Sequence, residues 1–294
     1  MPYEVTVRLA SFFAIIVVMA LWELRAPRRQ LTVSKKKRWF ANLGIVVLNS
    51  ALVRVAIPIL PVGLALLANK EGWGLLNVLD LPFPMEVVVG IALLDLVVYL
   101  QHVMFHAVPL LWRLHMMHHA DLDYDLTTGL RFHPIEIIIS MGIKLTAVAA
   151  IGPSVFTVIL FEILLNGLAT FNHGNVHIPR AIDRVLRLFV VTPDMHRVHH
   201  SVTIRETNSN FGFNLPWWDR LFGTYRAQPV AGHEGMTIGL AQFRSPDRRG
   251  LLWMLALPFT GKPGNYAINR WGKEPPIKKD KINVHEKLED NSSH

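Results

Sequence analysis

Long apolar runs dominate the first part of the chain. Three of them, 5–22, 41–68 and 85–100, approach or exceed the roughly twenty residues that a helix needs to cross a bilayer. No small-residue cleavage site follows the first run, so we interpret it as a retained span rather than a secretory signal. Pro58 and Pro61 lie inside the second run and predict a kink there, because proline disrupts helical hydrogen bonding. The pattern predicts three membrane-spanning helices.

A fourth apolar run covers residues 135–171 and is interrupted by Gly152 and Pro153. Its two halves are each about as long as one crossing, which favours a helical hairpin. The alternative is one long kinked helix, and that helix would carry His173 to the opposite side of the membrane. The chain is therefore predicted to be all-α, an integral membrane helical bundle with about four spans, or three spans plus a hairpin.

The composition agrees with a membrane protein. Of the 294 residues, 51% are hydrophobic and only 18% are charged, and the mean hydropathy is +0.30. Soluble domains carry about 25% charged residues, so this chain is depleted. It contains no cysteine. The absence excludes disulfides, thiolate nucleophiles, iron–sulfur clusters and cysteine-ligated zinc.

The basic residues are unevenly spread, although the net charge is +8. Seven of them lie between the first two apolar runs, whereas the connection 69–84 holds only Lys70. Because basic loops stay in the cytoplasm, segment 25–38 predicts the cytoplasmic end of the bundle. We expect the segment to contact anionic lipid head groups rather than nucleic acid, because apolar runs flank it. The third span and the hairpin then bring His102 and His173 to that same end, which predicts a cytoplasmic, histidine-rich helical cap.

Histidine is concentrated in the middle of the sequence. Eleven of the fourteen histidines lie between residues 102 and 200. Ten of them form four short clusters, which read "HVMFH" at 102–106, "HMMHH" at 115–119, "HGNVH" at 173–177 and "HRVHH" at 196–200. On a helix, positions i, i+3 and i+4 share one face, so each cluster points its imidazoles in one direction.

Such a concentration predicts metal binding. Neutral imidazoles packed together without a metal would leave many ring nitrogens unpaired. Ten imidazoles exceed the three or four ligands usual for one zinc ion, so they suit two ions with about five ligands each. Two divalent ions among neutral ligands also call for nearby carboxylates that hold the remaining ring N–H groups. Candidates near in sequence are Asp121, Asp123, Asp125, Glu136 and Asp194.

Asp95 is the best buried candidate for this supporting role. Positions 95, 99, 102 and 106 share one helical face, which places its carboxyl on the side of the first histidine pair. The alternative is a polar residue that serves helix packing.

The order of the four clusters, followed by "NFGFNLPWWDRLFGTY" at 210–225, resembles the fatty acid hydroxylase superfamily, also called the sterol desaturase family. Members are integral-membrane, histidine-rich, non-haem di-iron oxygenases. The resemblance covers about residues 95–226. It implies two iron ions, with zinc as a possible substitute after purification, held by His102, His106, His115, His118, His119, His173, His177, His196, His199 and His200.

Three further residues outside this pattern have expected roles at the site. His133 lies outside the ligand pattern and is expected to orient a loop or to line the entrance of the site. Together with Asp95, Asp121 and Asp194, it is expected to support the ligands. Glu162 and Asn166 precede His173 on the same helical side and are candidates for the substrate channel or for helix packing.

The resemblance implies hydroxylation or desaturation of a lipid, such as a sterol or a fatty-acyl lipid, with O2 and external electrons. A separate ferredoxin-like or haem protein is the implied donor, and the basic segment 25–38 is expected to help dock it. A zinc-dependent membrane hydrolase is less favoured because "HExxH" is absent. A metal transporter is disfavoured because few polar residues lie inside the spans. A non-catalytic membrane metal-binding protein remains an alternative. We expect a multi-pass protein of a bacterial inner membrane.

The remaining sequence is less informative. The aromatic segment 210–225 is expected to pack as a cap near the interface, and the run 251–259 is too short to span and is expected to lie along the surface. The polar tail from Lys273 is expected to be disordered. The predicted regions are N-terminal transmembrane helices with the basic loop at 1–84, a di-iron catalytic domain at 85–226 and a C-terminal surface segment with a tail at 227–294.

Overall fold

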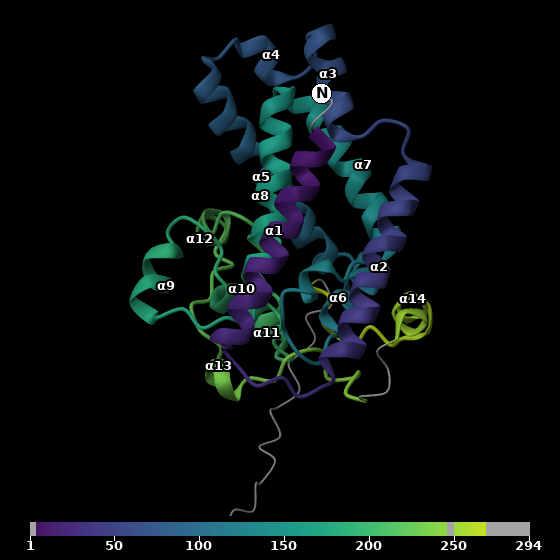
Figure 1. The fold of residues 1–294 in the computed structure, drawn as a ribbon, viewed down its shortest axis with the longest axis vertical. Coiled ribbons are helices and arrows are strands. Elements are labelled where there is room, and N and C mark those ends of the chain that lie inside the picture. The colour runs from purple at the N-terminus through teal and green to yellow at the C-terminus, as the bar shows by residue number, and fades with distance from the viewer. Residues whose placement is uncertain (1–3, 246–249, 269–294) are drawn as a thin grey trace, which may run out of the picture.

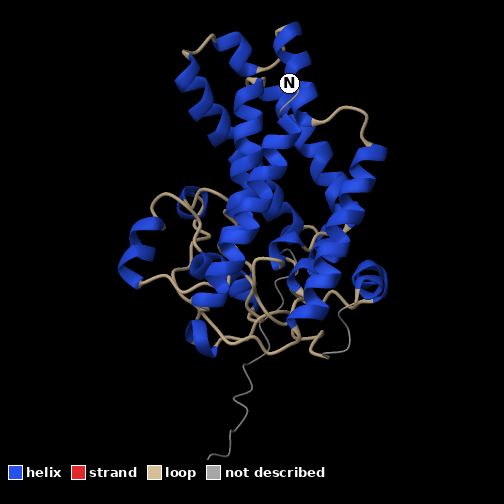
Figure 2. Cartoon of the chain, viewed as in Figure 1, coloured by secondary structure: helices blue, strands red, loops and turns tan. Residues whose placement is uncertain are grey.

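The structure is a computed structural model that describes residues 4–245 and 250–268, and the polar tail from Lys273 lies outside these ranges. The described part contains helices and isolated β-bridges but no strand, as Figure 2 shows. The helices are α1 (Glu4–Arg25), α2 (Lys35–Ala56), α3 (Pro61–Glu71), α4 (Leu75–Leu79), α5 (Phe83–Ala107), α6 (Pro109–His119), η1 (Thr128–Leu130), α7 (Pro134–Ile151), α8 (Val155–Asn172), α9 (Arg180–Leu186), α10 (Pro193–His199), α11 (Ile204–Thr207), α12 (Trp217–Leu221), α13 (Gly232–Gly235) and α14 (Leu251–Thr260).

Five helical stretches are long and apolar enough to cross a membrane, which confirms a multi-pass bundle. They lie at Val5–Arg25, Lys35–Leu79, Phe83–Ala107, Pro134–Ile151 and Val155–Asn172. In Figure 1, α1, α2, α5, α7 and α8 run along the long axis of the molecule. Their outer faces carry exposed apolar side chains such as Val47, Val55 and Val88, which suit contact with lipid tails.

The predicted hairpin over residues 135–171 is confirmed. α7 ends at Ile151, Gly152 follows in the left-handed region with φ 65°, and α8 starts at Val155. Ser154 caps α8 by accepting a hydrogen bond from the Thr157 N–H. The alternative of one long kinked helix is therefore wrong, and His173 returns to the same end of the bundle as the other clusters.

The apolar run 41–68 was predicted to be one kinked helix, but in the structure it forms two separate helices. α2 ends at Ala56 and α3 begins at Pro61, with residues 57–60 outside any helix. Pro58 disfavours helical geometry in the residue before it, whereas Pro61 occupies the first position of α3, where a missing N–H costs no hydrogen bond. Two neighbouring prolines therefore separate the helices instead of bending one.

The short helices α6 and α9–α13 and the loops between them form a layer at one end of the bundle (Figure 1). Segment 26–34, which joins α1 to α2, lies at this same end. Its Pro27 forms a β-bridge with Val176, and Asp123 accepts hydrogen bonds from the backbone N–H groups of Thr32 and Val33. The basic segment and the histidine clusters therefore share one end of the molecule, as the charge pattern predicted.

Candidate metal centre

Four helix ends supply the histidines. The last turns of α5 hold His102 and His106, and the last turns of α6 hold the cluster 115–119. α10 and the residue after it supply the cluster 196–200, and His173 directly follows the last residue of α8. Because the clusters on α5, α6 and α10 each occupy about one turn of helix, their rings leave the backbone on one face and point into the space between the four elements.

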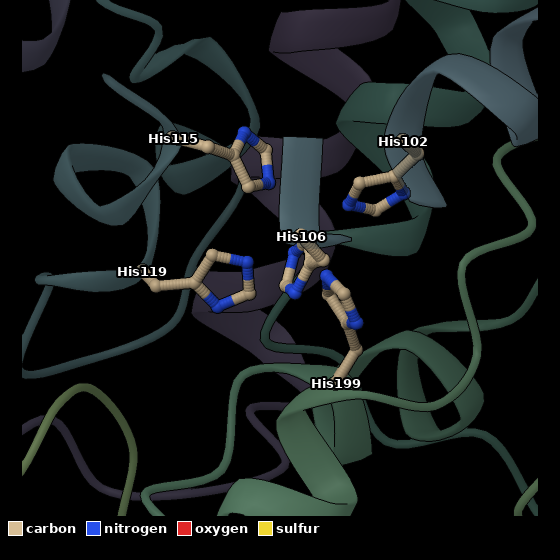
Figure 3. A group of neighbouring side chains, drawn as sticks. All are labelled: His102, His106, His115, His119 and His199. Carbon is tan, nitrogen blue, oxygen red and sulfur yellow. The ribbon is translucent and has the colours of Figure 1, made fainter. Parts of the chain in front are cut away.

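Nine of the ten predicted ligands come together in this space, in two groups. Within each group every histidine offers a ring nitrogen within 4.8 Å of the others, and all nine residues are buried. Figure 3 shows the rings of the first group turned toward one another. The five-histidine group is His102, His106, His115, His119 and His199, and the four-histidine group is His118, His173, His196 and His200.

His177 is the predicted ligand that the structure leaves outside both groups. Its prediction assumed that "HGNVH" forms one helical turn, but α8 ends at Asn172 and residues 174–177 are not helical. The His177 side chain is exposed, while its backbone N–H donates to the Ala26 carbonyl at 2.8 Å. The spacing of four therefore does not bring its ring beside that of His173.

Hydrogen bonds fix which ring nitrogen of the five-histidine group is free. The Nδ1–H groups of His102 and His199 donate to the carbonyls of Phe211 and Ser209, both at 2.8 Å. His106 donates from Nδ1 to the side-chain oxygen of Asn208 at 3.1 Å. A carbonyl can only accept, so each Nε2 carries a lone pair. These Nε2 atoms are buried and have no hydrogen-bond partner.

Glu136 provides the carboxylate that the sequence analysis expected. His115 donates from Nδ1 to Glu136 Oε1 at 2.7 Å, and its Nε2 is likewise buried without a partner. Among the described residues, Glu136 is the only carboxylate hydrogen-bonded to a ring of either group. A carboxylate in this position fixes the tautomer of a ligating histidine and raises its basicity.

The four-histidine group has the same character. His173 Nδ1 donates to the Ala169 carbonyl at 2.8 Å, so its Nε2 carries a lone pair. That Nε2 lies 3.3 Å from Nε2 of His118 and 3.1 Å from Nε2 of His196. Both ring nitrogens of His200 are buried without a partner. Nitrogen atoms brought this close in a buried space suit a shared cation.

Burial keeps the rings of His118, His173 and His199 uncharged. Outside the spans, burial lowers the pKa of His173 to about 4 and holds the pKa of His118 and His199 well below its ordinary value, with repulsion between neighbouring rings as the second cause for the latter two. Metal ligation requires neutral imidazole. The residues present therefore fit two metal ions, with five and four nitrogen donors.

The other residues that we expected to support the ligands are hydrogen-bonded to other groups instead. Asp95 accepts hydrogen bonds from Trp218 Nε1 at 2.9 Å and Leu215 N at 3.2 Å, so it ties α5 to the chain that follows the last histidine cluster. His133 begins α7 by accepting a hydrogen bond from the Ile135 N–H, three residues before Glu136.

Asp121 and Asp194 contact arginines rather than histidine ligands. Asp121 accepts two hydrogen bonds from Arg38, each 2.8 Å long. Asp194 contacts Arg28 and Arg197, which connects α10 to the segment after α1. Neither carboxylate is hydrogen-bonded to a ring of the two groups.

Sequence reasoning missed Asn208 and the carbonyls of Ser209 and Phe211. Two of these three groups are main-chain atoms, which no side-chain pattern reports. Asp219 holds this stretch in place by accepting the N–H groups of Phe211 and Gly212, each at 2.8 Å. The only available signal was the position of "NSNFGF", which begins eight residues after the last histidine of the last cluster. This stretch orients ligands in addition to covering them.

A cavity of about 970 Å³ extends from the metal centre into the bundle. His102, His115 and His118 line it, together with many apolar residues of α1, α2, α5, α7 and α8. The two candidates for the substrate channel, Glu162 and Asn166, also line it. The centre is therefore reached through a largely apolar space between helices.

Comparison with known proteins finds a match to a protein family. The family model described as fatty acid hydroxylase matches residues 87–224, which include all four histidine clusters. The matched region is just under half of the chain. This match agrees with the family resemblance that the histidine clusters indicated. No solved structure matches the chain significantly.

Two relatives illustrate the range of the family. The chain is 25% identical over 279 residues to the ornithine lipid hydroxylase OlsE of Rhizobium tropici, a match that covers 90% of this chain and 78% of the relative. It is 31% identical over 144 residues to the alkylglycerol monooxygenase of Homo sapiens, which covers 47% of this chain and 30% of the relative. The chain thus matches less than a third of the human enzyme's length. Both relatives are oxidoreductases that act on lipids.

Replacing Glu136 with glutamine should weaken the metal centre without removing a ligand. An amide accepts the His115 N–H less strongly than a carboxylate does, so we expect metal affinity or turnover to fall about 10- to 100-fold. Metal content after dialysis against a chelator series measures the effect. Glu71→Gln, which neutralises an exposed carboxylate at the other end of the bundle, is the matched control. Equal behaviour of the two variants would contradict the role of Glu136.

The metal-free protein should lose stability in acid. The pKa of His173 is about 4 in the folded chain, against about 6.5 in an unfolded chain. Between these values the unfolded state binds more protons, so stability rises with pH and is lost as pH falls from about 6.5 toward 4. Melting temperatures of the chelator-treated protein across this range test the prediction. A melting temperature that is constant or rises toward pH 4 would contradict it.

Proposed function

We propose that this protein is a membrane-bound, non-haem di-iron oxygenase that hydroxylates or desaturates a lipid. The observation that carries the proposal is the pair of buried histidine groups whose free ring nitrogens converge at the inner end of an apolar cavity. Two metal ions with nitrogen ligands fit the groups, and a largely apolar cavity suits a substrate made mostly of C–H bonds.

Iron is proposed over zinc because of the reaction. Cleavage of an unactivated C–H bond needs a strong oxidant, which two iron ions supply with O2 and external electrons, whereas zinc has no accessible redox change. The chain's own residues position the substrate and exclude water: the apolar walls of α5, α7 and α8 surround the cavity, and fixed carbonyls with Glu136 hold the rings. The family match and the activities of the relatives support this reading.

The substrate is proposed to be an amphiphilic lipid. The two relatives act, by their names, on ornithine lipid and on alkylglycerol. Anaerobic purification with quantified iron, followed by O2, a reductant and lipid extraction, tests the activity. A lipid that gains one oxygen atom or loses two hydrogen atoms is the expected product, and the zinc-loaded protein should give neither. An iron-loaded protein that alters no membrane lipid would contradict the proposal.

A separate electron donor is proposed to dock at the histidine end. Arg28 and Arg38 are occupied by ion pairs with acidic residues of the same chain. Arg25, Lys36 and Lys37 are exposed there and leave a positive surface for an acidic ferredoxin-like or haem protein. Charge reversal at these three positions should slow reduction by the native donor and leave the metal content unchanged. Unchanged turnover would contradict this docking surface.

The histidine end is proposed to face the cytoplasm of a bacterial inner membrane, since the basic segment lies at that end. The cysteine-free chain allows a direct test with single cysteines at two exposed positions, Lys37→Cys and Lys70→Cys. A membrane-impermeant maleimide should label Lys70→Cys in intact spheroplasts and Lys37→Cys only after the membrane is opened. The reverse labelling would overturn the orientation.

A further inference from the structure

The cavity carries charged residues well away from the histidines. Arg8 of α1, Arg54 of α2, Lys144 of α7 and Glu162 of α8 all line it. Each of these helices is among the five candidate spans. Charged side chains inside membrane segments are costly and usually mark a functional site. Neither the metal centre nor the proposed reaction uses these four residues.

These four residues bring three positive charges and one negative charge to the cavity lining. Glu162 is 3% exposed and forms ion pairs with Arg8 at 2.8 Å and Lys144 at 3.3 Å. Arg54 forms no ion pair with another described residue and is exposed on the cavity wall. The cluster Arg8, Arg54, Lys144 and Glu162, here called the charged subsite, therefore holds an excess of positive charge.

The charged subsite lies at a defined depth from the metal centre. Glu162 lies eleven positions before His173, which directly follows α8, and this corresponds to about 16 Å along the helix. On α7, eight residues separate Lys144 from Glu136, which corresponds to about 12 Å. Apolar side chains such as Leu94, Val98 and Leu165 line the cavity as well. The cavity lining thus combines cationic side chains, apolar side chains and three histidines of the two groups.

We propose that the charged subsite binds an anionic head group, a carboxylate or a phosphate, of an amphiphile whose apolar chain extends toward the histidines. Arg54 would supply the unpaired cation, and Glu162 would hold Arg8 and Lys144 in place beside it. Guanidinium groups bind both kinds of oxyanion strongly because they offer paired N–H donors. Oxidation of the lipid's apolar chain rests on the proposed function. In that case the carbon atom that reacts would lie far from the head group.

Binding to the metal-free protein tests the charged subsite independently of turnover. The protein is placed in nanodiscs of phosphatidylcholine, a lipid without net charge. Palmitate and hexadecyl phosphate are compared with methyl palmitate and hexadecanol, which have the same chain without the anionic charge. Binding is measured at a pH well above the carboxyl pKa. We expect both anionic probes to bind at least about ten-fold more tightly than the uncharged probes. This factor corresponds to the binding free energy of about one charge-assisted hydrogen bond.

Arg54→Gln removes the unpaired cation and leaves the ion pairs of Glu162 intact, so the variant should fold. It should reduce the preference for anionic probes about ten-fold. Lys70→Gln removes one positive charge at the same end of the bundle but outside the cavity, and should leave the preference unchanged. Melting temperatures confirm that both variants are folded.

Each result has a defined meaning. Preference for palmitate alone identifies a carboxylate ligand, preference for the phosphate alone identifies a phosphate ligand, and preference for both supports the shared oxyanion chemistry. Equal binding of charged and uncharged probes, or equal effects of Arg54→Gln and Lys70→Gln, would overturn the charged subsite. A lack of lipid oxidation by the iron-loaded protein would instead overturn the proposed function, and the binding result would stand.

Discussion

Replacing His199 with alanine should abolish turnover and reduce the metal content from two ions to one. The Nε2 of His199 is one of five converging nitrogens, and the Ser209 carbonyl fixes it in the orientation that ligation requires. His196→Ala should remove the other ion, because His196 belongs to the four-histidine group. Elemental analysis of the purified variants, together with lipid oxidation under O2, measures both effects.

His177→Ala is the matched control for these two variants. It removes a histidine that the sequence pattern includes among the ligands but that the structure places on the surface. We therefore expect the variant to keep both ions and full activity. Loss of an ion from His177→Ala would show that the loop after α8 moves toward the centre when metal binds, and would contradict the two groups as described.

Replacing Arg38 with methionine should destabilise the protein by about 3–5 kcal/mol, the usual cost of breaking a buried ion pair. Arg38 is fully buried and donates to both Asp121 and Asp125. Burial opposes ionisation of Asp121, but attraction to Arg38 and Arg131 outweighs it and lowers the pKa of Asp121 to about 2. The variant would leave buried carboxylates without their strongest partner.

Chemical unfolding of the variant in micelles measures this loss, with Lys37→Met as the control, because Lys37 is the exposed basic neighbour of Arg38. Asp121 follows His119 by two residues, so we also expect the Arg38 variant to release metal more readily. A loss of stability no larger than that of Lys37→Met would show that the network contributes little. Arg38→Lys should restore only part of the stability, since lysine lacks the paired donors.

The helical bundle was predictable because membrane spans are continuous apolar runs. The hairpin at Gly152 and the common position of the histidine clusters follow from span lengths and charge. The break between α2 and α3 was harder to predict from the sequence. One proline can kink a helix whereas two can end it, and the length of the apolar run does not distinguish these outcomes.

At the candidate metal centre, the positions of nine predicted ligands were predictable, because helical turns group eight of them and the hairpin returns His173 to the same end. His177 was not, since its prediction depended on where α8 ends. The supporting groups were hardest to predict. Asp121 and Asp194 are near the ligands in sequence, but each is bound to arginine, whereas Glu136 reaches His115 from another helix.

The carbonyls of Ala169, Ser209 and Phe211 fix the rings that receive their hydrogen bonds. Any amino acid presents the same carbonyl, so the identity of residue 209 matters less for the tautomer of His199 than the number of residues in this turn. A one-residue insertion or deletion there would shift the register and turn the wrong nitrogen inward. In this stretch, chain length is therefore constrained more tightly than side-chain chemistry.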